Sequence, residues 1–162
     1  MSETQLSDYF KFFPKEVPAT DEFVMPLDPV NLLVKHRGDI IYSVDITTRE
    51  ASLMLPDLAQ NIVDWCHSRR AKLCLATEFS DFQSRVWATL LSKIEAHRLT
   101  SYSELASLMG SPNSFRAVAR VLATNDFALV LPCHLVNRKS GELSGFKWGL
   151  DVKRKLQQLE VG

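Results

Sequence analysis

The residues best suited to chemistry in this sequence are Cys133 and His134, which stand side by side after Pro132. The apolar run 127–131 precedes them and the polar segment 137–142 follows, so we expect a buried strand to deliver the cysteine onto a turn. The thiolate is the reactive form of cysteine, and a nearby imidazole favours it. The pair is therefore a candidate nucleophile. The alternative is a small buried side chain beside a hydrogen-bonded histidine, with no chemical role.

Length and composition describe an ordinary globular chain of 162 residues, with 46% hydrophobic and 23% charged residues, enough for one domain or two small ones. The polar start and the short apolar runs predict neither a secretion signal nor a membrane span. Cys66, Cys74 and Cys133 are an odd set without a disulfide framework, which favours a reducing, intracellular compartment. We interpret Cys66, which lies mid-helix although His67 follows it, and Cys74 as structural.

Charge is unevenly distributed along the chain. The net charge is zero, which argues against a strongly basic nucleic-acid binder, but residues 79–162 carry +4 and residues 1–78 carry −4. A modestly basic half can bind a polyanion with an affinity that falls as salt rises. Chance segregation of charge is the alternative.

Hydrophobic patterns predict an α/β first domain over residues 1–78. Prolines punctuate the first 28 residues, for which we expect irregular structure. Strands are predicted at 30–36, 40–47 and 72–76, with a helix at 56–70 between the last two. The expected arrangement is a small antiparallel sheet with one helix.

The second domain, residues 79–162, is predicted to be mainly helical. Helices are expected at 81–97, 101–108, 115–124 and 151–160, the second opened by a capping box from Ser101 to Glu104. The second and third helices, joined through a Gly- and Pro-containing turn, form a candidate helix-turn-helix. Arg116 and Arg120 share one face of its second helix because they lie four residues apart.

Several motifs occur in order at compatible spacing over about half of the chain. They are Phe82-Gln83-x-x-Val86-Trp87, Ser101-Tyr102-x-x-Leu105-Ala106, Arg116-Ala117-Val118-Ala119, Asn125, Pro132-Cys133-His134-x-Val136, Gly141-x-Leu143-x-Gly145-Phe146, Trp148-Gly149-Leu150, Lys153 and Glu160. With these motifs the second domain resembles the catalytic domain of the O6-alkylguanine-DNA alkyltransferases, the methylated-DNA–protein-cysteine methyltransferases. The resemblance implies a ribonuclease-H-like first domain and a winged-helix-like second domain, although the first half matches only in length and coarse pattern.

The resemblance implies a self-consuming reaction. An alkyl group would pass once and irreversibly from guanine O6 in duplex DNA to Cys133, after the nucleotide is flipped out of the helix. His134, backed by Glu160, would take the thiol proton through a water molecule, because neighbouring side chains rarely bond each other directly. Tyr102 would donate a proton toward the guanine ring.

The resemblance also assigns the DNA contacts and the substrate pocket. Arg116 would fill the vacated base stack, and the recognition helix would enter the minor groove, where readout carries little sequence information. By the same resemblance, DNA binding falls to Tyr102, Arg116, Ala117 and Arg120, the hinge to Asn125, and the pocket to Pro132, Val136, Phe146 and Lys147. Taken singly, each has an ordinary structural explanation, such as a helix C-cap for Asn125.

Three positions depart from the family pattern: Leu135 replaces a usual arginine, Phe146 a frequent tyrosine, and Lys147 a small hydroxyl residue of some members. Lys147 could contact phosphate or line the alkyl pocket. No Cys-x-x-Cys or other dense ligand cluster is present, so we expect no metal and no cofactor. The expected partner is double-stranded DNA containing O6-alkylguanine, bound by a monomer away from membranes. The expected location is cytoplasmic in a prokaryote and nuclear in a eukaryote.

Two other functions remain open from the sequence. Alkyltransferase-like proteins bind lesions without repairing them and have tryptophan in place of the cysteine, so Cys133 argues against that class. A cysteine hydrolase would need an oxyanion site and a water path, which the sequence does not suggest.

Overall fold

The computed structural model describes residues 5–94, 98–141 and 145–161, with side chains up to residue 158 in the last range. The chain divides into two compact units. The sheet unit comprises Leu6–Phe79 together with Asp126–Val130, and the helical unit comprises Ser80–Asn125 and Leu131–Gly162, with the first five residues. The predicted division into 1–78 and 79–162 differs from these units mainly at residues 126–130, which return to the sheet unit, and also at the first five residues and at Phe79.

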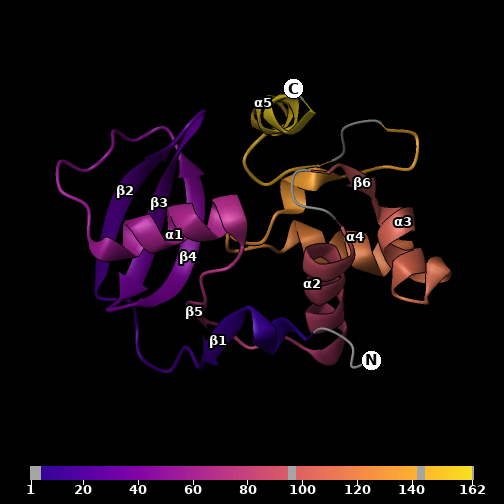
Figure 1. Ribbon diagram of the computed structural model, residues 1–162, viewed down its shortest axis with the longest axis horizontal. Helices are drawn as coiled ribbons and strands as arrows, with labels where there is room; N and C mark the ends of the chain where they lie inside the picture. The colour runs from indigo at the N-terminus through magenta and orange to yellow at the C-terminus, as the bar shows by residue number, and fades with distance from the viewer. Residues whose placement is uncertain (1–4, 95–97, 142–144, 162) are drawn as a thin grey trace. The chain divides into compact units, whose positions relative to one another are not determined.

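A five-stranded mixed sheet forms the sheet unit (Figure 1). In sheet order the strands are β1 (Phe10–Phe13), β5 (Leu73–Ala76), β4 (Ile40–Thr47), β3 (Val30–Arg37) and β2 (Asp21–Leu27). Strands β2, β3 and β4 form an antiparallel meander, whereas β5 runs parallel to both β4 and β1. The expectation of a purely antiparallel sheet is therefore wrong. A helical crossover leads from β4 to β5, and such a connection joins parallel strands.

The first 28 residues are more regular than the sequence predicted, because they supply both edge strands of this sheet. Prolines misled the prediction: Pro26 lies within β2, opposite Asn31 of β3. Strand β2 is at the edge of the sheet, where the missing N–H of a proline need not interrupt a ladder. Phe23, Val24 and Met25 are buried and anchor this edge.

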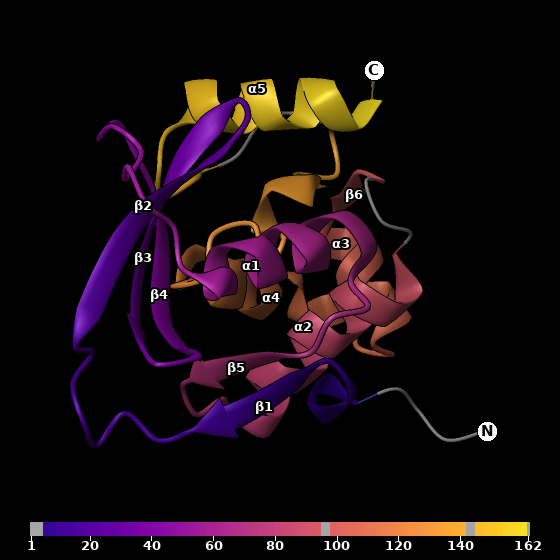
Figure 2. The same cartoon turned by 60° about the vertical axis from the view of Figure 1, so that its left-hand side comes forward.

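Helix α1 (Asp57–Ser68) lies across the sheet and packs Leu58, Ile62 and Trp65 into its core (Figures 1 and 2). Pro56 occupies its N-cap position, and Arg69 ends it in the left-handed conformation with φ 56°.

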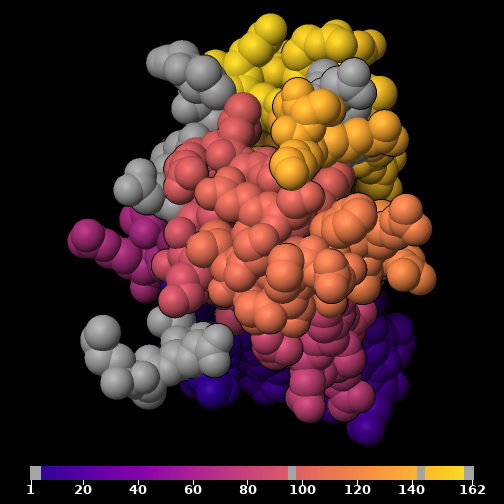
Figure 3. Space-filling view, turned by 90° about the vertical axis from the view of Figure 1, so that its right-hand side faces the viewer, coloured from indigo at the N-terminus to yellow at the C-terminus, as the bar shows by residue number. Residues whose placement is uncertain are grey.

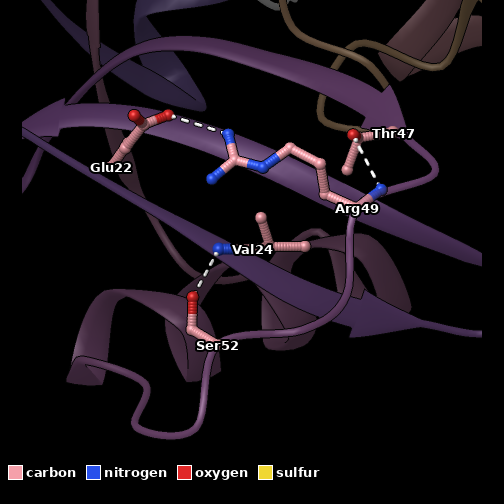
Figure 4. A network of polar contacts seen from close by, with 5 residues as sticks. All are labelled: Glu22, Val24, Thr47, Arg49 and Ser52. Carbon is pink, nitrogen blue, oxygen red and sulfur yellow. Dashed lines mark hydrogen bonds and ion pairs between the residues drawn. The ribbon is translucent and has the colours of Figure 1, made fainter.

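The connection from β4 to α1 is tied back to strand β2 by polar contacts (Figure 4). The Ser52 N–H donates to the Val24 carbonyl at 2.8 Å, and the Val24 N–H donates to Ser52 Oγ at 2.9 Å. Arg49 pairs with Glu22 at 3.3 Å. These contacts attach the segment that contains Arg49 and Ser52 to two positions of the edge strand β2, Glu22 and Val24.

Residues 126–130 do not form the buried strand expected before the cysteine. Phe127 makes an isolated bridge to Val44 of β4, supported by a hydrogen bond from the Ala128 N–H to the Val44 carbonyl at 2.9 Å. Leu129 then takes a left-handed conformation, φ 65°, which ends the extended run. The Val130 carbonyl accepts from Trp65 Nε1 at 2.8 Å. The apolar run is buried as predicted, but it turns instead of continuing, a feature that hydrophobicity does not encode.

The helical unit contains α2 (Asp81–Lys93), α3 (Tyr102–Leu108), α4 (Phe115–Ala123) and α5 (Leu150–Val161). A two-stranded parallel ladder, β6 (Thr100–Ser101) with β7 (Val136–Asn137), completes it. Ser80 and Gln83 form a capping box at the start of α2, and Ser101 Oγ caps the Glu104 N–H of α3. In the described ranges, no helix combines the length and apolarity needed to cross a membrane.

Candidate active site

Cys133 opens a single 3-10 turn, Cys133–Leu135, with Pro132 immediately before it. The Cys133 N–H donates to the Leu131 carbonyl at 2.8 Å, and the Leu135 N–H donates to the Pro132 carbonyl at 3.2 Å. Cys133 is 7% exposed and His134 4% exposed. The turn therefore holds both side chains in a nearly closed interior.

Asn125, directly after α4 and its cap, contacts this turn through its side chain. Its Nδ2 donates to the Leu131 carbonyl at 2.8 Å and to Cys133 Sγ at 3.1 Å. Both amide hydrogens are thus committed to the segment that carries the cysteine. A buried amide that bonds a sulfur stabilises the thiolate more than the thiol.

Burial dominates the acidity of the cysteine and raises the pKa of the Cys133 thiol to about 11. The hydrogen bond from Asn125 and the nearby charges of Lys153 and Lys147 lower that pKa but do not offset burial. At neutral pH only about one molecule in ten thousand would then carry a thiolate. Cys133 at rest is therefore a thiol, and any use of its sulfur as a nucleophile would need a base to remove the proton.

Lys153 of α5 is almost fully enclosed, at 1% exposure. Its Nζ donates to the Val136 carbonyl at 2.8 Å and lies 5.9 Å from the Phe146 ring centre. Burial lowers the pKa of Lys153 to about 8, while the attraction of Cys133 opposes that change. A buried lysine beside a thiol favours the thiolate, because an ammonium group attracts the negative charge that forms.

The β6–β7 ladder brings α3 to the turn that carries Cys133. Thr100 pairs with Val136 and Ser101 with Asn137, so Tyr102, the first residue of α3, follows directly on the strand beside the turn. A cavity of about 30 Å³ reaches Cys133. Its lining comprises Tyr102, Ala119, Leu122, Ala123, Cys133, Gly145, Phe146, Lys147 and Trp148. The space is enough for about one small group beside the sulfur.

A larger groove of about 790 Å³ shares four lining residues with this cavity. The groove is lined by Tyr102, Ser103, Phe115, Arg116, Ala119, Ala123, Arg138, Lys139, Ser140 and Gly145. Figure 3 views the face on which α3 and α4 lie next to each other, with the segment 138–141 beside them. Three cations, Arg116, Arg138 and Lys139, line the groove, which suits an anionic ligand.

Comparison with known proteins identifies the family. A family model described as "6-O-methylguanine DNA methyltransferase, DNA binding domain" matches residues 81–162. The chain belongs to this family. A methylated-DNA--protein-cysteine methyltransferase of Kluyveromyces lactis is 32% identical over 155 residues, covering 91% of this chain and 79% of that protein.

Solved structures agree with this membership. The O6-methylguanine methyltransferase of Mycobacterium tuberculosis superimposes with a TM-score of 0.66 at 27% identity, covering 86% of this chain and 91% of that one. A crystal structure of the M. tuberculosis protein in complex with DNA gives a TM-score of 0.66 at 28% identity, covering 85% and 90% of the two chains. The mixed sheet and the helical unit together are therefore an alkyltransferase fold.

Of the site residues that the sequence singled out, Cys133, Tyr102, Phe146 and Lys147 surround the small cavity of this family member. Arg116 and Tyr102 line the groove. Lys147 lines the same cavity, and its Nζ lies 5.3 Å from the Trp148 ring centre.

Four other predicted residues lie elsewhere among the described residues. Pro132 and Val136 are buried on the turn itself, outside the lining of the small cavity. Ala117 and Arg120 are on α4 but not on the wall of the groove, where Ala119 and Ala123 stand. Glu160 falls within α5, but its side chain is outside the described residues.

Sequence reasoning gave no role to Lys153, Gln157, Arg138 and Lys139. The Arg138-Lys139 pair was visible in the polar loop after the turn, and its charge was the available signal. Lys153 and Gln157 lie four apart on one face of α5, but a lysine in an apolar stripe is ordinarily read as solvated. In the part of the chain that the structure describes, no three His, Cys, Asp or Glu side chains gather as a metal site.

Proposed function

We propose that this chain repairs DNA by moving an alkyl group from O6 of guanine in a duplex to its own Cys133. The supporting observation is that the cavity at Cys133 shares four lining residues with a groove that carries three cations. The groove would hold the DNA strand and flipped base, and the cavity would receive the alkyl group. Membership of a family named for this reaction agrees with it.

The step balances without a cofactor. Cys133 Sγ attacks the alkyl carbon, the carbon–O6 bond breaks, and a thioether forms on the protein. The thiol proton passes to His134 through a water molecule, with Glu160 behind the imidazole, and the guanine anion takes a proton from Tyr102. Because the thioether is stable, each molecule acts once.

Several finer features belong to this proposal. Helices α3 and α4 act as a helix-turn-helix in a winged-helix-like domain, and the sheet unit is ribonuclease-H-like. Arg116 fills the base stack, with Ala117 and Arg120 on the same helix in the minor groove. The protein acts as a monomer in a reducing compartment, where Cys133 stays a thiol.

Peptide mass spectrometry tests the proposal. After incubation with duplex DNA containing O6-methylguanine, the peptide with Cys133 should gain one methyl group, in an amount that never exceeds the protein added. A Cys74→Ser variant should behave like the parent, and Cys133→Ala should bind the duplex without transfer. Binding without methyl gain by the parent would indicate a lesion-binding protein instead, and loss of the lesion over many turnovers would indicate a hydrolase.

A further inference from the structure

The carbonyl of His134 is held by a side chain from α5. Gln157 Nε2 donates to the His134 carbonyl at 2.7 Å and to Asn137 Oδ1 at 2.9 Å. Gln157 Oε1 in turn accepts from Asn137 Nδ2 at 3.1 Å. Gln157 and Asn137 are buried, at 8% and 6% exposure. The two amides therefore form a closed pair, and the remaining N–H of Gln157 reaches the catalytic turn.

The orientation of both amides follows from this arrangement. A carbonyl oxygen can only accept, so the nitrogen of Gln157 must face His134. Its oxygen then faces the amide nitrogen of Asn137, which fixes Asn137 as well. Each group has one low-energy orientation, and the pair is a rigid support for the His134 backbone.

Lys153 strengthens the same attachment one helical turn earlier. It donates to the Val136 carbonyl at 2.8 Å, while Gln157 donates to the His134 carbonyl, so α5 holds two carbonyls of one short segment. Two bonds from a single helix face restrict rotation of the peptide planes between them. The imidazole of His134 projects from this backbone, so the two bonds fix the point from which it reaches toward its neighbours.

We propose that Gln157, fixed by Asn137, is a positioning residue that sets His134 where its imidazole takes the proton of Cys133. The inference rests on the proposed proton transfer from Cys133 to His134. Two apolar side chains would fill the same space but would leave the buried His134 carbonyl without its donor, so the amide pair fixes the backbone at His134 in a way that packing alone does not.

The experiment compares Gln157→Leu with Gln158→Leu, the same change at the exposed neighbouring residue of α5. Single-turnover transfer from O6-methylguanine duplex is measured between pH 7 and 9.5. For Gln157→Leu we expect a loss of about 10-fold at pH 7 that shrinks as pH rises, because hydroxide then removes the proton that a misplaced imidazole cannot. Gln158→Leu should match the parent throughout.

Asn137→Ala should give an intermediate loss of the transfer rate. It removes the amide pair but leaves the bond from Gln157 to His134, so the loss should be smaller and have the same pH dependence. If Gln157→Leu does not fold, Gln157→Met supplies an unbranched side chain of similar length. Other titratable groups facing Cys133 are Lys153 on α5 and, in the cavity lining, Lys147 and Tyr102, all unchanged in these variants.

A second readout separates this inference from the proposed function. Reaction of Cys133 with iodoacetamide, followed by peptide mass spectrometry, needs no DNA and should show the same pH-dependent loss. If the parent takes no methyl group from DNA, the proposed function fails while the iodoacetamide profile still tests the positioning role. Equal losses at every pH, or no loss in Gln157→Leu, would overturn it, since a purely structural role lowers the amount of folded protein without reshaping the profile.

Discussion

Asn125 donates a hydrogen bond to the sulfur of Cys133 at 3.1 Å, from a position directly after the helix that lines the groove. The same amide also holds the Leu131 carbonyl. A single residue thus connects α4 to the candidate nucleophile and works against the rise in the pKa of Cys133 that burial causes. The Asn125 side chain should therefore affect two quantities that can be measured separately, the stability of the fold and the pKa of the Cys133 thiol.

Asn125→Ala should raise the pKa of Cys133 further and lower stability. The stability cost should be about 1–3 kcal/mol, because the buried Leu131 carbonyl loses its donor. Chemical denaturation measures the free energy of unfolding, and the pH dependence of iodoacetamide labelling at Cys133 measures the thiol. Asn113→Ala, at an exposed position, is the control. An unchanged labelling profile would remove the electrostatic role of Asn125.

Lys153→Met should slow labelling of Cys133 at pH 7 by about 10-fold, since the lysine charge lowers the pKa of the thiol. Methionine keeps most of the length of the side chain and fills the same space. Lys155→Met, on the exposed face of α5, should leave the rate unchanged. Equal rates in both variants would mean that the charge of Lys153 does not reach the sulfur.

Lys153 should also shape stability against pH. Its folded pKa is lowered to about 8 from 10.5. Between these values the unfolded chain binds more protons than the folded one, so the contribution of Lys153 to stability rises with pH there. Relative to the parent, Lys153→Met should therefore be most stable below pH 8 and lose that advantage toward pH 10. Both proteins are compared in a Cys133→Ala background, because the pKa of Cys133 itself depends on the charge of Lys153. The comparison then cancels the opposite effect of Cys66, whose folded pKa is raised. A constant difference across this range would contradict the buried charge.

Arg69→Gly should stabilise the protein by about 0.5–1 kcal/mol. Arg69 ends α1 at φ 56°, a conformation that glycine adopts without strain. Gly110→Ala is the matching test in the opposite direction. Its φ is 78° and a Cβ there would meet nothing within 4 Å, so any loss in the thermal midpoint reports backbone strain alone. A stabilised Gly110→Ala would show that this conformation carries no such cost.

The family could be predicted from the sequence because its motifs depend on the local order of residues, whereas the role of Cys133 as nucleophile stays a prediction. Cys133, His134 and the motifs around them keep fixed spacing, and Ser101 caps the helix that carries Tyr102. The helix that carries Arg116 has a periodic apolar face, although Ser114 at its N-cap makes no side-chain hydrogen bond. The predicted helix 81–97 is shorter in the structure, where α2 ends at Lys93. Residues 95–97 of that prediction lie outside the described residues.

What the sequence could not give depends on tertiary packing. The two strands within the first 28 residues owe their pairing to neighbours far along the chain, and Pro26 obscured the second of them. The role of Lys153 and Gln157 requires knowing that α5 faces Val136 and His134. Ala119 and Ala123 line the groove and Ala117 does not. The face that α4 turns toward the groove depends on packing, and a sequence motif does not specify it.

Arg138 and Lys139, which line the groove, should bind DNA phosphates. Replacing both with alanine should weaken binding to a duplex at low salt and reduce the slope of log affinity against log salt by about 2, since each phosphate contact contributes about 0.9. Arg154 and Lys155, an adjacent pair of the same two residue types on α5, are exposed and provide the matched control when changed together to alanine. Fluorescence anisotropy over a salt series measures both pairs. Both double variants lose two positive charges, so a general loss of electrostatic attraction would change the affinity and the slope by the same amount in each. If the duplex contacts the groove, only the Arg138 and Lys139 variant should lose affinity and slope. Equal slopes would place the duplex elsewhere on the protein.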